Sequence, residues 1–192
     1  MNRIESIQNP KIKQWKKLHT KKGREQAQQF LIEGKHLIEE ARLSNVETLE
    51  LLVEENYDIP KGWSEWSVPI TYVTKRVLEE LSETETPQGM VAVCQQLQHN
   101  LAPKNGRFLL LDSLQDPGNV GTIIRTADAA GVDGVILGNG CVDMYNGKVI
   151  RATQGSLFHL PVIKANLEKW VEELQQLNIP VYGTALENGI DY

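Results

Sequence analysis

The stretch that decides the fold of this chain runs Leu111-Asp112-Ser113-Leu114-Gln115-Asp116-Pro117-Gly118-Asn119-Val120-Gly121-Thr122-Ile123-Ile124-Arg125. The apolar run over residues 108–111 that leads into it is typical of a parallel strand buried on both faces. A turn-rich loop follows, and apolar spacing predicts a helix that begins near Asn119 and covers residues 120–130. Ligands of open α/β sheets gather at the carboxyl ends of strands, so we expect a functional site here.

Within this predicted helix, Val120, Ile124 and Ala127 share an apolar face, which aims Arg125 away from the core. The helix N-terminus presents unpaired N–H groups to an anion in the loop. The loop is neither a GxGxxG dinucleotide motif nor a phosphate-binding Gly-Lys-Ser/Thr loop. A purely structural interpretation stays open, in which Asn119 caps the helix and Arg125 pairs with Asp128 one turn later.

Outward from this stretch, apolar runs alternate with helical patterns, which favours an α/β fold. The runs that predict strands are residues 30–32, 49–53, 70–73, 90–93, 135–137, 160–163 and 181–182. The patterns that predict helices start at Asn9-Pro10 and cover 35–42, 75–81 and 167–177. A polar segment over residues 95–106 has the composition of a linker, so we expect one domain over residues 1–100 and a second over 106–192.

Charge is distributed unevenly along the chain. Its net charge is −5, yet residues 1–36 hold nine Lys and Arg against three Glu. The remaining residues therefore carry 11 basic and 22 acidic side chains. A basic arm on an acidic body is typical of proteins that bind a phosphate backbone, although a solvated helix face explains the charge equally well.

Composition narrows the class of protein further. No apolar run reaches the length of a membrane span, and the N-terminus lacks the layout of a signal peptide. Cys94 and Cys141 lie in apolar contexts without a CxxC spacing, which favours buried thiols in a reducing compartment. The four histidines have no ligand spacing, so no metal site is expected. These features predict a cytoplasmic protein that does not enter a membrane.

Residues 116–127 resemble the first motif of the SpoU-type (TrmH-like) RNA 2′-O-ribose methyltransferases of the SPOUT superfamily. The likeness continues through residues 131–137 and 146–161. Upstream, Phe30-Leu31-Ile32-Glu33-Gly34 and Thr86-Pro87-Gln88-Gly89 resemble the family's RNA-substrate-binding domain, which has a ribosomal-protein-like fold. The resemblance implies a small N-terminal α/β domain followed by an α/β-knot methyltransferase domain with a parallel sheet.

The resemblance also implies an activity. Members of the family transfer a methyl group from S-adenosylmethionine to a ribose 2′-hydroxyl and use no metal, and the ribosomal-protein-like domain favours rRNA over tRNA. It makes Arg125 and Asn119 the catalytic candidates. The candidate RNA contacts are Arg24, Lys35 and Arg151, and the candidate cofactor contacts are Thr184, Ala185 and Leu186.

The role of Arg125 has two interpretations. The family's arginine has been proposed as a general base toward the ribose hydroxyl. An arginine has a pKa above ~12 and hardly ever loses its proton in a protein, so we favour a clamp for RNA phosphate and for negative charge on the ribose oxygen.

The family's two C-terminal motifs, which form the knot, most of the cofactor pocket and much of the homodimer interface, have no counterpart before Tyr192. We therefore expect an unknotted chain with an open sheet edge, weak cofactor binding and weak dimerisation. Two other functions stay open: a non-catalytic RNA-binding module on the same scaffold, and a nucleotide-binding α/β protein, which the missing phosphate-loop glycines disfavour.

Overall fold

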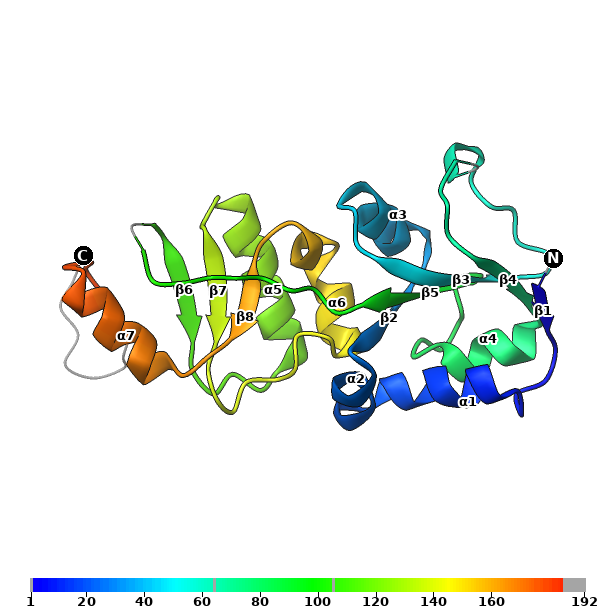
Figure 1. The fold of residues 1–192 in the computed structure, drawn as a ribbon, viewed down its shortest axis with the longest axis horizontal. Helices are drawn as coiled ribbons and strands as arrows, with labels where there is room; N and C mark the ends of the chain where they lie inside the picture. Colours follow the sequence, from blue (N-terminus) through cyan, green and yellow to red (C-terminus); the bar gives the residue numbers. More distant parts are fainter. Residues whose placement is uncertain (1, 64, 105, 185–192) are drawn as a thin grey trace.

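The structure is a computed structural model, and it describes residues 2–63, 65–104 and 106–184. Two α/β halves lie side by side along the long axis of the molecule (Figure 1). The strands are β1 (Asn2–Ile4), β2 (Gln29–Glu33), β3 (Thr48–Glu54), β4 (Ile70–Val73), β5 (Met90–Gln95), β6 (Phe108–Leu111), β7 (Gly134–Leu137) and β8 (Val162–Lys164). The helices are α1 (Pro10–Lys16), α2 (Lys21–Ala27), α3 (Lys35–Leu43), α4 (Lys75–Leu81), α5 (Pro117–Ala129), α6 (Gly147–Thr153) and α7 (Leu167–Gln176).

The N-terminal half, residues 2–95, is built on a mixed sheet with the strand order β1-β4-β3-β5-β2. Strands β1, β4 and β3 are parallel, whereas β5 runs antiparallel to both β3 and β2. Helix α3 covers one face, and α1 and α4 cover the other (Figure 1). Alternate residues of β3 serve the two faces: Leu51 and Val53 pack on the α3 side and Leu52 on the α1 and α4 side.

The basic arm folds as its sequence pattern predicts. Asn9 caps α1 by accepting a hydrogen bond from the Lys11 amide at 2.9 Å, and Pro10 holds the first helical position. Ile12 and Trp15 are buried, which leaves the lysines of α1 exposed on the surface. The pattern did not predict β1 or α2, two short elements on either side of this helix.

The C-terminal half, residues 108–184, carries a parallel sheet with the order β6-β7-β8. Every residue of the central strand β7 is buried. Strand β6 is an edge of the described sheet and is only half buried, with Leu109 36% exposed, so the prediction that residues 108–111 are covered on both faces is wrong. An apolar run alone does not distinguish an edge strand from a central one.

Two further predictions about this half need correction. The run at residues 160–163 forms a strand only from Val162 to Lys164, because Leu160 lies in the turn that follows a short 3-10 segment. Val181 and Tyr182 form no strand, and Tyr182 is 91% exposed. None of the helices in the described ranges is long and apolar enough to cross a bilayer.

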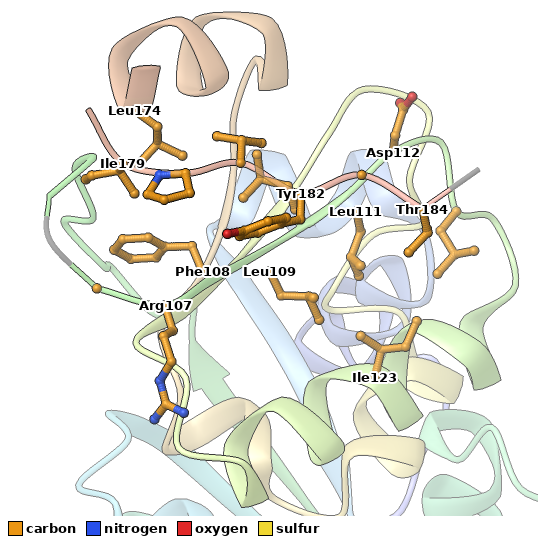
Figure 2. Close-up of a pocket in the computed structure, with 16 residues that line it drawn as sticks. Arg107, Phe108, Leu109, Leu111, Asp112, Ile123, Leu174, Ile179, Tyr182 and Thr184 are labelled. Atoms are coloured by element: carbon orange, nitrogen blue, oxygen red, sulfur yellow. The ribbon is translucent and has the colours of Figure 1, made fainter. Parts of the chain in front are cut away.

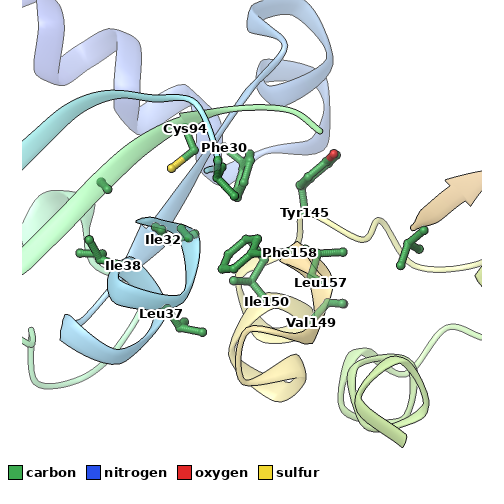
Figure 3. Packing of buried hydrophobic residues seen from close by; sticks show 14 of the residues in the cluster. Phe30, Ile32, Leu37, Ile38, Cys94, Tyr145, Val149, Ile150, Leu157 and Phe158 are labelled. Atoms are coloured by element: carbon green, nitrogen blue, oxygen red, sulfur yellow. The ribbon is translucent and has the colours of Figure 1, made fainter. Parts of the chain in front are cut away.

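One hydrophobic core joins the two halves. Phe30 on β2 stacks at 4.7 Å between ring centroids on Tyr145, which precedes α6, and lies 6.4 Å from Phe158 (Figure 3). The Tyr145 hydroxyl donates to the Leu97 carbonyl at 3.2 Å and accepts from the Leu97 amide at 2.8 Å, which fixes the linker. These contacts fix the position of the first sheet relative to the second.

Candidate active site and RNA-contacting surface

The loop after β6 leads into α5 through a side-chain cap. Asp116 accepts a hydrogen bond from the Asn119 amide at 2.7 Å, and Pro117 holds the first helical position. The helix therefore begins two residues earlier than predicted, and Asn119 is not its cap. Because Asp116 caps the helix, the Asn119 side chain is left exposed in the first turn, where it can meet a ligand.

Arg125 lies exposed on α5, opposite the buried Val120, Ile124 and Ala127. Its guanidinium has no hydrogen bond or ion pair with any residue that the structure describes. Asp128, the partner expected in the structural interpretation, instead lies 3.5 Å from His159 Nδ1. A cation held on a rigid helix and left unpaired is available for an anionic ligand.

A large hollow lies beside β6, between α5, the end of α7 and the segment that follows α7 (Figure 2). Its volume is about 730 Å³, within the range of ~300–1,000 Å³ that is usual for small-molecule sites. Leu109, Leu111 and Ile123 supply apolar walls, and Asp112 and Thr184 supply polar atoms. Of the predicted cofactor contacts, Thr184 lines this hollow, whereas Ala185 and Leu186 lie outside the described residues.

The hollow suits parts of S-adenosylmethionine, which combines an apolar adenine ring with a hydroxylated ribose and an amino acid. Apolar walls with few polar groups fit the adenine, and the Asp112 carboxylate at the end of β6 can accept hydrogen bonds from hydroxyl groups. The residues of the hollow therefore fit these parts of the cofactor. No group of three or more His, Cys, Asp or Glu side chains in the described ranges could hold a metal ion.

Arg24 is not placed to contact RNA. Its side chain is 4% exposed, and its guanidinium donates to Asp143 Oδ2 at 2.6 and 2.8 Å. Its Nη1 donates to the carbonyls of Leu18 and His19 at 2.8 and 3.0 Å. These partners hold the buried guanidinium, so Arg24 joins α2 to the loop before α6 in the other half.

The other two predicted RNA contacts differ in their availability. Arg151 on α6 is partly exposed and lies 3.6 Å from Glu83 of the N-terminal half. Lys35, the first residue of α3, is exposed and makes no direct ion pair with the residues described. The structure therefore leaves Lys35 open to solvent and places Arg151 at the junction of the two halves. No described contact joins either residue to Arg24.

Two histidines at the junction of the two halves were not predicted. His159 Nε2 lies 3.1 Å from Glu40 of α3, and His159 Nδ1 faces Asp128 of α5. His36 Nε2 lies 3.2 Å from the Gln154 carbonyl. The partners in these contacts lie far apart in the chain, so no local sequence signal could have identified them.

Two buried groups are excluded as nucleophiles. Burial raises the pKa of the Cys94 thiol to about 12. Burial also raises the pKa of the Tyr145 hydroxyl to about 12. Both groups stay protonated near neutral pH, so neither supplies a reactive anion.

Comparison with known proteins agrees with this geometry. Residues 106–192 match the SpoU rRNA Methylase family, and residues 9–92 match the MRM3-like substrate binding domain. The chain is 48% identical to the 23S rRNA (guanosine(2553)-2′-O)-methyltransferase RlmP of Bacillus subtilis, over all of this chain and 77% of that protein.

Two solved structures share the fold. A putative RNA methyltransferase of the TrmH family from Porphyromonas gingivalis superposes with a TM-score of 0.81 at 30% identity, covering 95% of this chain and 72% of that one. An AdoMet-bound rRNA methyltransferase from Sinorhizobium meliloti gives a TM-score of 0.78 at 29% identity, covering 91% of this chain and 68% of that one.

Proposed function

Because this chain belongs to the SpoU family of rRNA methylases, we propose that it methylates the ribose 2′-hydroxyl of a guanosine in 23S rRNA, with S-adenosylmethionine as the methyl donor. Residues 1–100 form the RNA-substrate-binding domain and residues 106–192 belong to the methyltransferase domain. The observation that carries the proposal is Arg125, a cation with no partner among the described residues, on the helix that also lines the cofactor-sized hollow through Ile123.

The cofactor supplies an electrophilic methyl group on a sulfonium. The ribose hydroxyl would give its proton to water and carry negative charge as its oxygen bonds to the methyl carbon, while the carbon–sulfur bond would break and release the neutral thioether S-adenosylhomocysteine. Arg125 stays protonated, holds an RNA phosphate and stabilises this charge through its planar fork of N–H donors. Asn119, exposed in the first turn of the same helix, orients the hydroxyl through its amide.

The RNA contacts of the proposal are Lys35 and Arg151. Lys35 is exposed, and the partly exposed pair of Arg151 with Glu83 is weak enough to open toward a phosphate. Arg24 is left out, since its buried ion pair occupies its donors. We also propose that the enzyme acts in the cytoplasm and, as the family resemblance implies, forms a homodimer, which light scattering on the protein measures.

The proposal is tested by labelled methyl transfer from S-adenosylmethionine to unmodified 23S rRNA, with 16S rRNA and tRNA as competing substrates. We expect incorporation into 23S rRNA only. Arg125→Ala should lower the rate by roughly 100-fold or more, as for loss of one donor at a developing oxyanion. Arg125→Lys should recover little of this, because an ammonium lacks the two-pronged geometry.

The matched control is Arg76→Ala, which removes an equally exposed arginine from α4 and should leave the rate unchanged. RNA binding by the protein without any methyl transfer would favour the non-catalytic module instead. Transfer to tRNA at a comparable rate would refute the choice of substrate. Near-full activity in Arg125→Lys would rule out the planar clamp.

A further inference from the structure

A second hollow lies on the N-terminal half, far from the cofactor-sized one along the chain. Its volume is about 580 Å³, and it is lined by Lys35, His36, Glu39, Tyr57 and Gln88. These residues come from the start of α3, the turn after β3 and the loop before β5. The hollow thus combines an aromatic ring, an amide, an ammonium group and an imidazole at one place on the surface.

The aromatic wall is held rigidly. Tyr57 is half buried, packs against the main hydrophobic core and is fixed through its backbone by the Glu54 carbonyl at 2.9 Å. Gly89 has a φ of +81°, and a β-carbon there would collide with the Tyr57 ring. The ring therefore rests directly on the glycine backbone, and it does not have to be ordered when a ligand arrives.

The amide wall is held in the same way. The Glu33 carboxylate accepts hydrogen bonds from the backbone N–H of Gln88 at 3.2 Å and from the hydroxyl groups of Ser82 at 2.7 Å and Thr84 at 2.9 Å. A β-carbon on Gly34, at a φ of +90°, would collide with Gln88 Oε1. Glu33 thus fixes the loop, and the side-chain amide of Gln88 is left without a hydrogen bond to any described residue.

The charge of the hollow favours an anionic partner. Arg42 donates two hydrogen bonds to Glu39, at 2.9 and 3.0 Å, and these bonds hold the pKa of the Glu39 carboxyl below its ordinary value. This pairing neutralises the acidic side chain in the hollow. The Lys35 ammonium then remains as a cation at its rim.

We propose that this hollow binds one unpaired nucleobase of the RNA substrate, with Tyr57 as the stacking platform. Gln88 hydrogen-bonds to the base edge, and Lys35 contacts the neighbouring phosphate. The inference rests on the proposed function and adds to it the place where the substrate RNA is read. A ring face, an amide that both donates and accepts, and a cation are the groups with which proteins bind unstacked bases in RNA loops.

The position of the hollow relative to Arg125 supports this assignment. Helix α3, which starts at Lys35, carries Glu40 one and a half turns later, and His159 links Glu40 to Asp128. Asp128 lies on α5, three residues after Arg125. A base held at the start of α3 is therefore bound to a helix that is fixed to the catalytic one.

The test measures binding of an RNA hairpin that carries the fluorescent base 2-aminopurine in its single-stranded loop. A fully paired duplex of the same length is measured for comparison. Stacking on Tyr57 should quench the 2-aminopurine. Tyr57→Leu keeps an apolar contact on Gly89 but removes the aromatic face, so it should weaken hairpin binding roughly 5- to 100-fold and restore fluorescence. Tyr57→Phe should bind and quench like the unmodified protein, and melting temperatures check that each variant folds.

Lys35→Ala should weaken binding of the hairpin and reduce the salt slope of that binding by about one phosphate contact. Lys75→Ala is its matched control, because Lys75 is the equally exposed first residue of α4 on the opposite face of the sheet, and its affinity should not change. The pocket is refuted if Tyr57→Leu binds and quenches as the unmodified protein does, or if Lys75→Ala loses as much affinity as Lys35→Ala. If the hairpin binds at Tyr57 while 23S rRNA gains no methyl group, the pocket stands and the proposed enzyme activity fails.

Discussion

Three arginines of this chain differ in their partners, and these partners determine what each positive charge does. Arg24 is buried and shares its guanidinium among Asp143 and two carbonyls, so its charge serves the fold. Arg151 is partly exposed in a long, weak pair with Glu83. Arg125 has no partner in the described part of the chain and points to solvent. The same side chain is therefore structural, intermediate or available for RNA, depending only on what lies within its reach.

His99 should make the stability of the protein depend on pH. It lies in the linker, its Nε2 is buried without a hydrogen-bond partner among the residues described, and burial lowers its pKa below the ordinary 6.5. The unfolded chain then binds a proton more readily than the folded one. The unfolding free energy should be unaffected by this group above pH 6.5 and should fall as the pH drops from there toward the lowered value.

Urea denaturation at several pH values measures this dependence in the unmodified protein and in His99→Leu. The substitution removes both the titration and the unsatisfied nitrogen, so the variant should lose less stability on acidification. Parallel pH curves for the two proteins would show that His99 is protonated equally well in both states.

At the scale of elements, α5 and α6 cross at a glycine. A β-carbon on Gly121 would collide with the Ala152 side chain and would lie 2.8 Å from the Val149 carbonyl. Gly121→Ala should therefore lower the unfolding free energy by about 1–3 kcal/mol, more than the helix gains from alanine, and should slow methyl transfer as Arg125 shifts. Calorimetry and the transfer assay measure the two effects.

Gly118→Ala is the matched control on the same helix. A β-carbon at Gly118 would meet only Asp116 Oδ1, at 3.2 Å, so we expect a change in stability close to zero. Equal effects of the two substitutions would show that the crossing at Gly121 is not tight.

Elements with a strong local pattern could be predicted from the sequence. Strand β4, helix α4 and strand β6 have the bounds that their apolar spacing indicated. Short elements could not, because β1 is three residues long and is a strand only through its pairing with β4. The sequence offers Asn119 as one possible cap of α5, whereas the structure uses Asp116, which is followed by proline and is an equally strong start signal.

For the candidate site, the sequence alone places Arg125 and Asn119 near each other, because both lie in one motif on one helix; their roles stay a prediction. The sequence does not distinguish the buried Arg24 from an exposed basic residue, because its partner Asp143 is 119 residues away. Tyr57 and Gln88 meet only after β3 and β5 pair, so their shared hollow has no linear signature.

At the scale of the whole molecule, the buried ion pair between Arg24 and Asp143 should couple the two halves. Asp143→Asn leaves the Arg24 charge buried without its counterion, so we expect a loss of about 3 kcal/mol in unfolding free energy. Glu83→Gln, at the partly exposed pair with Arg151, should cost less than about 1 kcal/mol. Urea unfolding followed by tryptophan fluorescence compares them, and similar losses in both would contradict a special role for the buried pair.

The shared core around Phe30, Tyr145 and Phe158 also limits how these halves can be recombined. A substrate-binding half taken from a relative would have to place an aromatic ring against Tyr145, and its linker would have to present a carbonyl and an amide to the same hydroxyl. The two halves are therefore poor modules for exchange. A chimaera that redirects the enzyme to another RNA would work best with its crossover inside the N-terminal half, beyond the residues that contact α6.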